Sequence, residues 1–589
     1  MAAGVRRVGR PLPSSGRFVS RPVDSSRLDG DEGFAARSFL RSGGLSEADV
    51  RRRPVVGICT SWSELNPCNL PLRELSAAVK RGVLAAGGLA LEFPTISLSE
   101  ALIHPSTMLL RNLMAMDVEE MITASPIDAV VLLNGCDKTV AAQMMGALSA
   151  NKPALMLGSG YRPAGSWNDQ KLTIDDSWRL ADERRVGAIS EDEWRTFEGC
   201  ISPAAGVCNV LGTAITLAML SEVLGFALPG SALVPASSAE RIALAEQTGR
   251  RAVDVAKEER RPQGFVTRAA LHDAWRLVCA VGGSTNAILH LVAIAGRAGV
   301  SLGWNELQSL SEDTPTLARV KPNGPFELAD LHQAGGVPAI ARELADLWHV
   351  DRTTANGASW AATIDGTHAT PSPALAPRED PVLPRGAIAL LRGSLAPEGA
   401  VIKRSAATSA LLCHVGPAVV FDGVADLRAR IHDPNLAVTP SSVLVLRNVG
   451  PVGGPGMPEA GALPIPDKLY RTGVRDMVRI SDARMSGTAA GTIILHVNPE
   501  AAVGGPLGLV EDGDQIEVNV DEARLDLLVD EKELDRRRRT RAQAPAPSTA
   551  PSRGYRKMYA DHVTQVDQGC DFDFLIKQPA QEEQPMEVH

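Results

Sequence analysis

The sequence predicts an α/β protein with a large N-terminal domain and a smaller C-terminal, β-rich, barrel-like domain. From Pro54 onward, short apolar runs alternate with segments of helical spacing, which is typical of a parallel sheet flanked by helices. After residues 351–386, which are rich in Thr, Ala, Gly and Pro, the apolar runs are separated by glycine turns instead. With 589 residues, the chain is also too long for one ordinary hydrophobic core.

Four buried parallel strands are predicted in the first domain, at residues 55–59, 89–93, 129–133 and 154–157. Helices are predicted between them at residues 74–86, 105–121 and 140–151, with Pro105 in the first turn, where a helix tolerates proline. Residues 205–345 have mostly helical spacing. The glycine pair Gly282-Gly283 interrupts them, and such a pair permits close approach of the backbone to a ligand.

The second domain is predicted from five short β-rich runs, at residues 387–392, 418–421, 442–447, 492–497 and 515–520. A basic run at 536–539 leads into a Pro/Ala/Ser linker, and a packing-like pattern returns at 555–575. The predicted organisation is therefore an N-terminal arm (1–50), an α/β domain (51–370), a β-rich domain (385–535) and a linker with a C-terminal tail (536–589).

Composition excludes several classes of function. A net charge of −9 and 4% aromatic residues argue against a nucleic-acid partner, and no apolar stretch is long enough to span a bilayer. The eight cysteines lack the spacing of a disulfide framework, which indicates a reducing compartment and predicts a cytoplasmic protein. The first 23 residues carry five arginines and no acid. A disordered extension is the favoured interpretation of this segment, and an organelle-targeting segment is the alternative.

Three successive loops of the predicted sheet carry residues that can bind metals. Cys68 follows the first strand, Glu100 follows the second, and Cys136-Asp137-Lys138 lies where the third strand gives way to a helix. The carboxyl ends of parallel strands share one edge of a sheet, where ligands bind. Thiolates suit iron and carboxylates suit Mg²⁺.

A third cysteine, Cys208, precedes a predicted helix in a similar Gly-containing context. Three thiolates would leave one iron position open for a substrate oxygen, so the iron could act as a Lewis acid. The simpler interpretations are structural core cysteines and, for Glu100, an acid at a helix N-terminus.

Two stretches of the second domain also suggest chemistry. The glycine-rich loop 453–459 ends in the carboxylate of Glu459, although a plain turn would explain it as well. The stretch 480–488 predicts a strand-to-helix turn that exposes Ser486 beside a helix N-terminus, where an alkoxide would be stabilised. A capping serine is the simpler alternative.

Taken together, these stretches resemble the dihydroxy-acid dehydratase and 6-phosphogluconate dehydratase family. Six motifs occur in the family's order, at residues 62–69, 135–139, 208–214, 282–287, 453–459 and 481–488. The segments 62–69, 111–120 and 571–575 are most similar to the sugar-acid branch, of the arabonate dehydratase type. Leu70-Pro71-Leu72, Gly158 to Tyr161 and Val140 to Ala142 depart from that branch, which affects the expected substrate more than the expected reaction.

The resemblance implies a [2Fe–2S] cluster held by Cys68, Cys136 and Cys208. It also implies Mg²⁺ bound by Glu100, Asp137 and Glu459, with Lys138 joining as a carbamate. Ser486 would be the catalytic base, and Thr488 would contact the substrate. The family further suggests a homodimer or homotetramer.

These inferences predict a hydro-lyase that converts a 2,3-dihydroxy carboxylic acid, such as L-arabonate, D-xylonate or a related aldonate, into the 2-keto-3-deoxy acid. The runner-up substrate is 2,3-dihydroxyisovalerate, the branched-chain biosynthetic acid. Leu70 and Leu72 favour its apolar pocket. An iron–sulfur electron carrier or sensor is the alternative from another class, but it would leave Glu100, Lys138, Glu459 and Ser486 without a role.

Overall fold

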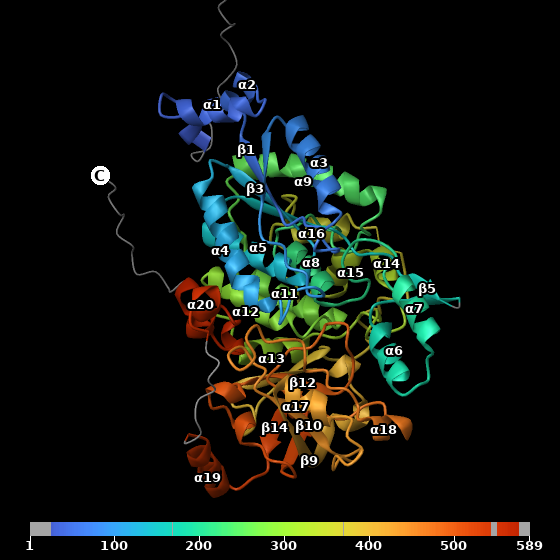
Figure 1. The fold of residues 1–589 in the computed structure, drawn as a ribbon. Coiled ribbons are helices and arrows are strands. Elements are labelled where there is room, and N and C mark those ends of the chain that lie inside the picture. Colours follow the sequence, from blue (N-terminus) through green and yellow to red (C-terminus); the bar gives the residue numbers. More distant parts are fainter. Residues whose placement is uncertain (1–24, 168, 369, 543–550, 577–589) are drawn as a thin grey trace, which may run out of the picture.

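The computed structural model describes residues 25–167, 169–368, 370–542 and 551–576. The first domain is built on a parallel sheet whose strands lie in the order β2-β1-β3-β4 (Figure 1). Their bounds are β1 (Val55–Thr60), β2 (Leu89–Pro94), β3 (Ala129–Asn134) and β4 (Ala154–Gly158). The order and the parallel pairing bring the ends of β1, β2 and β3 to one edge, as the sequence predicts.

Helices cover both faces of this sheet. Helices α3 (Leu72–Ala85) and α9 (Ala239–Lys257) pack on one face, and α4 (Met108–Ala124) and α5 (Asp137–Ala150) pack on the other. Val131 and Leu133 contribute to the first packing cluster, and Val130 and Leu132 to the second, because successive strand residues point to opposite faces. Helix α4 begins at Met108, so the prediction that it starts at Pro105 is wrong.

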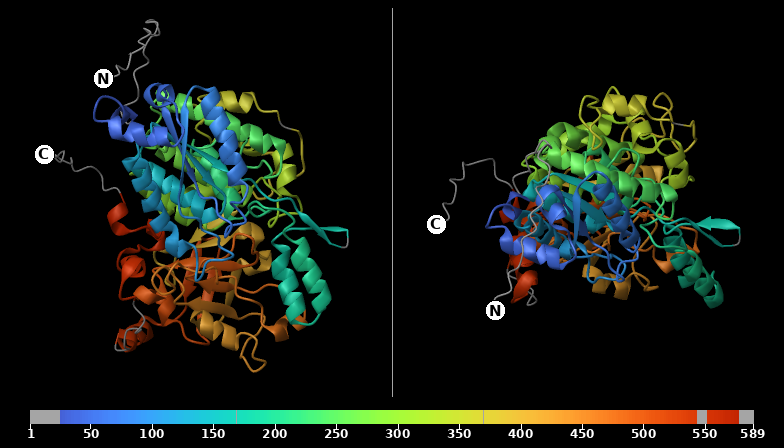
Figure 2. Two further views of the ribbon diagram at one scale, coloured as in Figure 1. Left: turned by 45° about the horizontal axis from the view of Figure 1, so that its top comes forward. Right: turned by 90° about the horizontal axis from the view of Figure 1, so that it is seen from above.

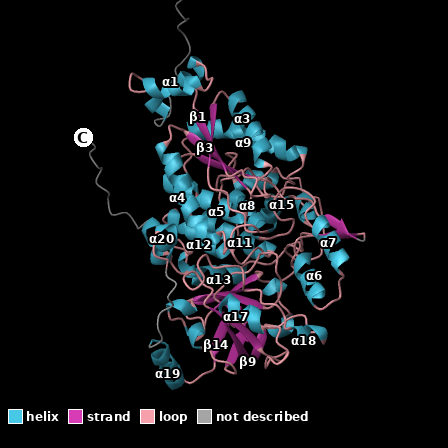
Figure 3. Cartoon of the chain, in the orientation of Figure 1, coloured by secondary structure: helices cyan, strands magenta, loops and turns pink. Residues whose placement is uncertain are grey.

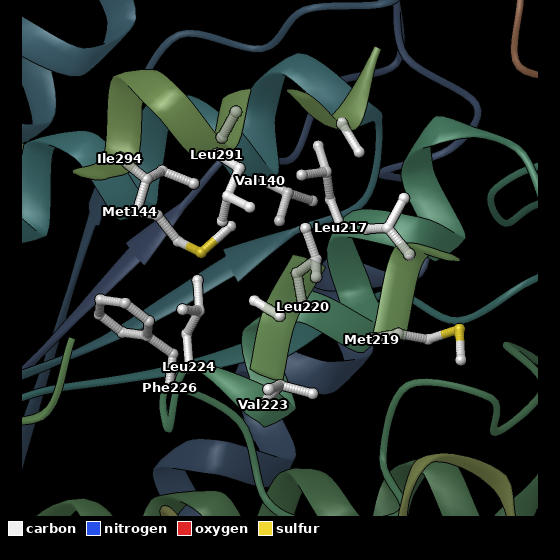
Figure 4. Close-up of a cluster of buried hydrophobic side chains, with 14 of the residues drawn as sticks. Val140, Met144, Leu217, Met219, Leu220, Val223, Leu224, Phe226, Leu291 and Ile294 are labelled. Carbon is white, nitrogen blue, oxygen red and sulfur yellow. The ribbon is translucent and has the colours of Figure 1, made fainter. Parts of the chain in front are cut away.

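Helix α5 is buried on all sides, because a second layer of helices covers its outer face. Figure 4 shows Val140 and Met144 of α5 among side chains of α8 (Thr213–Val223) and α12 (Ala287–Arg297). The remaining helices of this layer and its surroundings are α10 (Pro262–Phe265), α11 (Arg268–Val281), α13 (Trp304–Asp313), α14 (Leu328–Gln333), α15 (Gly336–Glu343) and α16 (Trp360–Asp365). The N-terminal segment adds α1 (Phe34–Ser42) and α2 (Glu47–Arg52).

The second domain is an eight-stranded mixed sheet in the order β14-β13-β9-β10-β11-β12-β8-β7. Its strands are β7 (Ile388–Leu391), β8 (Gly399–Lys403), β9 (Cys413–Asp422), β10 (Val443–Arg447), β11 (Arg479–Ser481), β12 (Ile493–Asn498), β13 (Gln515–Asn519) and β14 (Arg524–Leu527). The two outermost strands meet at Arg392, whose N–H donates to the Ala523 carbonyl at 2.8 Å and whose carbonyl accepts from Leu525 N at 2.9 Å. The sheet is therefore nearly closed, and the predicted barrel-like fold is confirmed.

An arm and four further helices surround these two bodies. The hairpin β5 (Gly165–Trp167) and β6 (Gln170–Leu172), with helices α6 (Asp176–Arg185) and α7 (Glu191–Cys200), projects from the side of the molecule (Figure 2); we call residues 165–200 the arm. Helices α17 (Gly423–Arg430) and α18 (Asp467–Arg471) lie against the barrel, and α19 (Glu531–Ala542) follows it (Figure 3). Helix α20 (Gly554–His562) returns to the first domain.

The described residues contain no helix that is long and apolar enough to cross a membrane. The arginine-rich start of the chain lies outside the described residues, and so does most of the predicted 542–552 linker.

Candidate active site

The loops that carry the three predicted cluster cysteines meet at the edge of the parallel sheet. The Asn69 side chain accepts a hydrogen bond from the Cys136 N–H at 3.1 Å and donates one to the Ser61 carbonyl at 2.8 Å. A Cβ at Gly135 would lie 2.7 Å from the Cys68 carbonyl oxygen. Only glycine therefore lets the Cys68 loop approach the end of β3 so closely.

The Cys208 loop, about 70 residues further along the chain than Cys136, lies against the same site. Gly206 N donates to the Pro67 carbonyl at 3.2 Å, and Val207 N donates to the Gly160 carbonyl at 3.0 Å. The thiols of Cys68 and Cys136 form a hydrogen bond, which lowers the pKa of Cys68 and raises that of Cys136. Burial raises the pKa of Cys208 to about 12, and the charge of Cys68 adds to this effect. Cys136 is buried and Cys68 and Cys208 are partly buried, and the raised pKa values of Cys136 and Cys208 oppose ionisation of all three thiols in the absence of a cation.

A second cluster of charged groups surrounds the Lys138 amine. Its Nζ lies 2.5 Å from Asp137 Oδ2, 3.2 Å from Glu100 Oε2 and 3.4 Å from Glu459 Oε1. Lys138 is fully buried, yet its pKa is raised: burial and the charge of Arg484 act to lower it, and the three carboxylates outweigh them. All four predicted Mg²⁺ ligands therefore lie together, contributed by the loop after β2, the first turn of α5 and the loop after β10.

Two side chains to which the sequence analysis gave no role complete this cluster. Arg484 donates to Glu459 Oε1 at 3.0 Å, to Ser106 Oγ at 2.9 Å and to the Met457 carbonyl at 2.8 Å. Asn286 Nδ2 lies 3.2 Å from Glu459 Oε1 and donates to the Met485 carbonyl at 3.0 Å. Asn286 and Arg484 lie inside two of the six sequence motifs, 282–287 and 481–488. Their membership in these motifs could have identified them as candidate site residues.

The loop that carries Ser486 differs from the prediction. Residues 482–492 form an irregular loop between β11 and β12, so the expected helix N-terminus beside Ser486 is wrong. The chain instead returns directly to the barrel, through a turn at Gly487 and Thr488. A Cβ at Gly487 would lie 2.7 Å from Thr213 N, so glycine here lets the loop rest on the start of α8, just after Cys208.

Within this loop the two predicted functional hydroxyls are paired. Ser486 Oγ lies 2.8 Å from Thr488 Oγ1 and also accepts from Thr488 N at 3.3 Å. Trp178 of the arm donates from Nε1 to Thr488 Oγ1 at 2.9 Å. The neighbouring Met485 carbonyl is bound by the same Asn286 amide that contacts Glu459, which links the hydroxyl pair to the carboxylate cluster.

One cleft reaches this region, with an empty volume of about 1240 Å³ that includes its open mouth. Glu100, Glu459 and Trp178 line it. The rest of its lining includes apolar and basic side chains from both domains: Ile103, His104, Val424, Leu427, Arg428, Ile431 and His432. A small molecule in the cleft can therefore contact both the carboxylate cluster and hydrogen-bond donors.

The donor types suit the two cofactors expected. Three thiols of one site could hold an iron–sulfur cluster, and three carboxylates could hold Mg²⁺. In the described part of the chain, no three His, Cys, Asp or Glu side chains already stand at metal-binding spacing. Among the carboxylates the Lys138 ammonium takes the place of a cation, since all three lie within 3.4 Å of it.

Similarity to known proteins places this two-domain chain in the class of dehydratases, the carbon–oxygen hydro-lyases. The chain matches the N-terminal family model of the dihydroxy-acid/6-phosphogluconate dehydratases over residues 53–363 and the C-terminal model over residues 374–570. It is therefore a member of the dihydroxy-acid/6-phosphogluconate dehydratase family, as the sequence motifs indicate.

Curated relatives cover nearly the whole chain. The L-arabonate dehydratase of Azospirillum brasilense is 44% identical over 92% of this chain and 94% of its own length. The 6-deoxy-6-sulfo-D-gluconate dehydratase of Pseudomonas putida is 42% identical over 94% of this chain and 96% of its own. The dihydroxy-acid dehydratase of Roseiflexus sp. is 36% identical over 86% and 91%.

Proposed function

We propose that this dehydratase converts a sugar acid, a pentonate such as L-arabonate or D-xylonate or a related aldonate, into the 2-keto-3-deoxy acid. The observation that carries the proposal is the shared cleft. Glu100 and Glu459 line it from the carboxylate cluster, and Trp178 lines it while holding Thr488, the partner of Ser486. A hydroxy acid in this cleft would thus meet the oxygen ligands directly, beside the Trp178 indole that is hydrogen-bonded to the hydroxyl pair.

In this proposal Cys68, Cys136 and Cys208 hold a [2Fe–2S] cluster, and Glu100, Asp137, Glu459 and carbamylated Lys138 hold Mg²⁺. When bound, these groups supply Lewis acidity toward the substrate's carboxylate and hydroxyl oxygens. The buried Lys138 fits a carbamate role, because its Nζ already points among the carboxylates with which a carbamate oxygen would share a cation.

Two residues of this chain, Ser486 and Thr488, have separate roles in the reaction. Ser486, as an alkoxide, removes the proton from C2; the 3-hydroxyl takes up a proton from solvent and leaves as water, and Ser486 returns its proton to solvent to complete the cycle. Thr488 holds the Ser486 oxygen and contacts the substrate. The resulting enol tautomerises to the 2-keto-3-deoxy acid, so the overall reaction is the loss of one water molecule.

The lining of the cleft supports the sugar-acid class. His104, Arg428 and His432 offer donors to hydroxyl groups beyond C3, which an aldonate has and 2,3-dihydroxyisovalerate lacks. The names of the two relatives that are 42–44% identical also denote sugar-acid substrates.

The runner-up, 2,3-dihydroxyisovalerate, is favoured by the apolar side of the same cleft, formed by Ile103, Leu427 and Ile431. Leu72 gives it no support, because this side chain is fully buried in the core beside α9. An electron carrier or sensor remains the alternative from another class, and it leaves the carboxylate cluster unused. A homodimer or homotetramer and a cytoplasmic location stay predictions of the sequence.

The deciding experiment is a keto-acid assay of freshly reconstituted, anaerobic protein over a panel of pentonates, hexonates and 2,3-dihydroxyisovalerate, with and without Mg²⁺. We expect Mg²⁺-dependent turnover, with at least one aldonate exceeding 2,3-dihydroxyisovalerate in kcat/KM. Preference for the branched-chain acid would favour the runner-up. A redox-active cluster without dehydration of any acid would favour the carrier or sensor.

A further inference from the structure

A hydrogen bond joins the arm to the reaction centre of the second domain. Trp178 lies on α6 of the arm, which follows the parallel sheet in the chain, and Thr488 lies in the loop between β11 and β12. The two residues are 310 positions apart, and the Trp178 indole Nε1 donates to Thr488 Oγ1 at 2.9 Å.

This hydrogen bond limits the directions open to the next one. An indole N–H only donates, so it occupies one lone pair of Thr488 Oγ1 and cannot accept the Thr488 hydroxyl proton. Ser486 Oγ lies 2.8 Å from Thr488 Oγ1, and either of these two hydroxyls can donate. Once Ser486 is an alkoxide it can only accept, so its oxygen then receives both the O–H and the backbone N–H of Thr488. Two donors aimed at one oxygen favour its deprotonated form.

We infer that Trp178 is a positioning residue for the dehydration: it orients the Thr488 hydroxyl so that this group donates to Ser486 and supports Ser486 as the base. The inference rests on the proposed function, which makes Ser486 the base. It extends the set of residues proposed for the reaction to Trp178, which belongs neither to the loops of the three cysteines nor to the barrel.

The arm is held on both sides of Trp178 in the sequence, which keeps this residue in place. On the side of the first domain, Ile174 N donates to the Asn209 side chain at 3.1 Å, next to Cys208, and Lys321 Nζ donates to Thr173 Oγ1 at 3.0 Å. On the side of the second domain, Arg185 forms an ion pair with Asp467. The arm therefore spans the border of the two domains.

Trp178 is dispensable for the packing of the arm. The arm has its own small core of Leu172, Leu180 and Phe197, against which Trp167 and Trp194 pack. Trp178 stands outside this core, with 42% of its surface exposed to the cleft side. An exposed indole whose N–H is aimed at a buried threonine is better explained by its hydrogen bond than by hydrophobic burial.

The test compares Trp178→Phe, which keeps the ring and removes the N–H, with Trp194→Phe, which alters a tryptophan in the core of the arm. Each variant is reconstituted like the wild type, and its iron content, visible spectrum and calorimetric Kd for the 2-keto-3-deoxy product are measured first. We expect all of these to match the wild type. We expect kcat of Trp178→Phe to fall about 10- to 100-fold with KM within about 3-fold, while Trp194→Phe keeps its kcat.

A double-mutant cycle with Thr488→Val tests the relay itself. If Trp178 acts through the Thr488 hydroxyl, adding Trp178→Phe to Thr488→Val causes little further loss of kcat. The kinetic isotope effect for substrate deuterated at C2 should also rise in Trp178→Phe, because proton removal becomes slower. The inference would be overturned if the double variant lost kcat by the product of the two single losses. It would also be overturned if Trp178→Phe and Trp194→Phe had the same kcat. An inactive wild type would instead count against the proposed function.

Discussion

Arg297 and Asp571 form a buried, bidentate ion pair although they are 274 positions apart in the sequence. Arg297 Nε lies 2.7 Å from Asp571 Oδ2 and NH2 lies 3.1 Å from Oδ1, and both side chains are 1% exposed. The pair ties the C-terminal tail to α12, while Arg111 donates to the carbonyls of Gly569 and Cys570 at 2.9 Å. The tail is thus part of the core structure of the first domain.

Breaking this pair should destabilise the protein strongly. Asp571→Asn leaves the buried Arg297 guanidinium with the partly exposed Glu119, 3.3 Å away, as its remaining carboxylate partner. We expect a loss of roughly 3–5 kcal/mol in the free energy of unfolding, measured by denaturant titration. Asp573→Asn is the matched control, because Asp573 is 60% exposed and pairs with the exposed His562. Equal stability of the two variants would contradict this account.

Ser486→Ala should remove turnover and leave the fold intact. Without the hydroxyl no group accepts the C2 proton, so we expect kcat to fall by at least about 100-fold. The cluster spectrum, the Mg²⁺ content and the melting temperature should stay those of the wild type. Ser441→Ala, at an exposed serine of the same domain, should leave kcat unchanged. Retained turnover in Ser486→Ala would remove this residue from the mechanism.

Glu459→Gln should abolish the response to Mg²⁺. The change removes one of the three carboxylates around Lys138, and neutral oxygen binds a divalent cation more weakly. For the wild type we expect the melting temperature to rise as Mg²⁺ is titrated in the presence of bicarbonate, and for Glu459→Gln we expect little rise. Glu398→Gln, at an exposed position before β8, is the control. A full Mg²⁺ response in Glu459→Gln would exclude Glu459 as a ligand.

Lys403 on β8 should make stability depend on pH. This lysine is fully buried, pairs across the strand with Ile388, and its Nζ has no hydrogen-bond partner within the described residues. Burial lowers the pKa of Lys403 from 10.5 to about 7. Between these two values the unfolded chain binds a proton that the folded protein lacks, so stability from this group rises with pH across that range and is flat below it.

Lys403→Met removes this titration. We expect the variant to be more stable than the wild type at pH 7, by on the order of a few kcal/mol, and to show a flatter profile of unfolding free energy from pH 7 to 10. Denaturant titrations at several pH values measure both effects. Lys532→Met, on the exposed face of α19, should leave the profile unchanged. An unaltered slope in Lys403→Met would show that its amine stays charged in the folded state.

The repeating parts of the fold could be predicted from the sequence, and the irregular parts could not. The buried strands β1 and β3 are continuous apolar runs, so their position, type and shared edge follow from pattern. Two barrel strands, β8 and β14, are absent from the predicted set, and β11 is predicted only as the strand that opens the 480–488 turn. β11 has only three residues, and β8 ends at the charged Lys403, so neither shows a clear period.

The candidate site, too, could be predicted only in part from the sequence. The sequence identified Glu100, Asp137, Lys138 and Glu459 as belonging to one motif set, and the structure brings them together. The sequence predicts a helix start at Ser486 where the structure has a turn, because a strand followed by a polar stretch looks alike in both cases. Asn286 lies in the 282–287 motif, although its contact with Glu459, 173 positions away, does not follow from that motif. Trp178 lies in none of the six motifs, and no local pattern can reveal its contact with a residue 310 positions away.

Helix α17 and the turn that follows it line the cleft with Leu427, Arg428, Ile431 and His432, and this surface element of the barrel holds none of the proposed ligands. We therefore expect changes at Arg428 or His432 to alter which acid binds without disturbing the cysteines or the carboxylates. Substrate specificity can thus evolve at this helix while the residues of the chemical step are kept. An engineer who wants a new substrate should begin with the same helix.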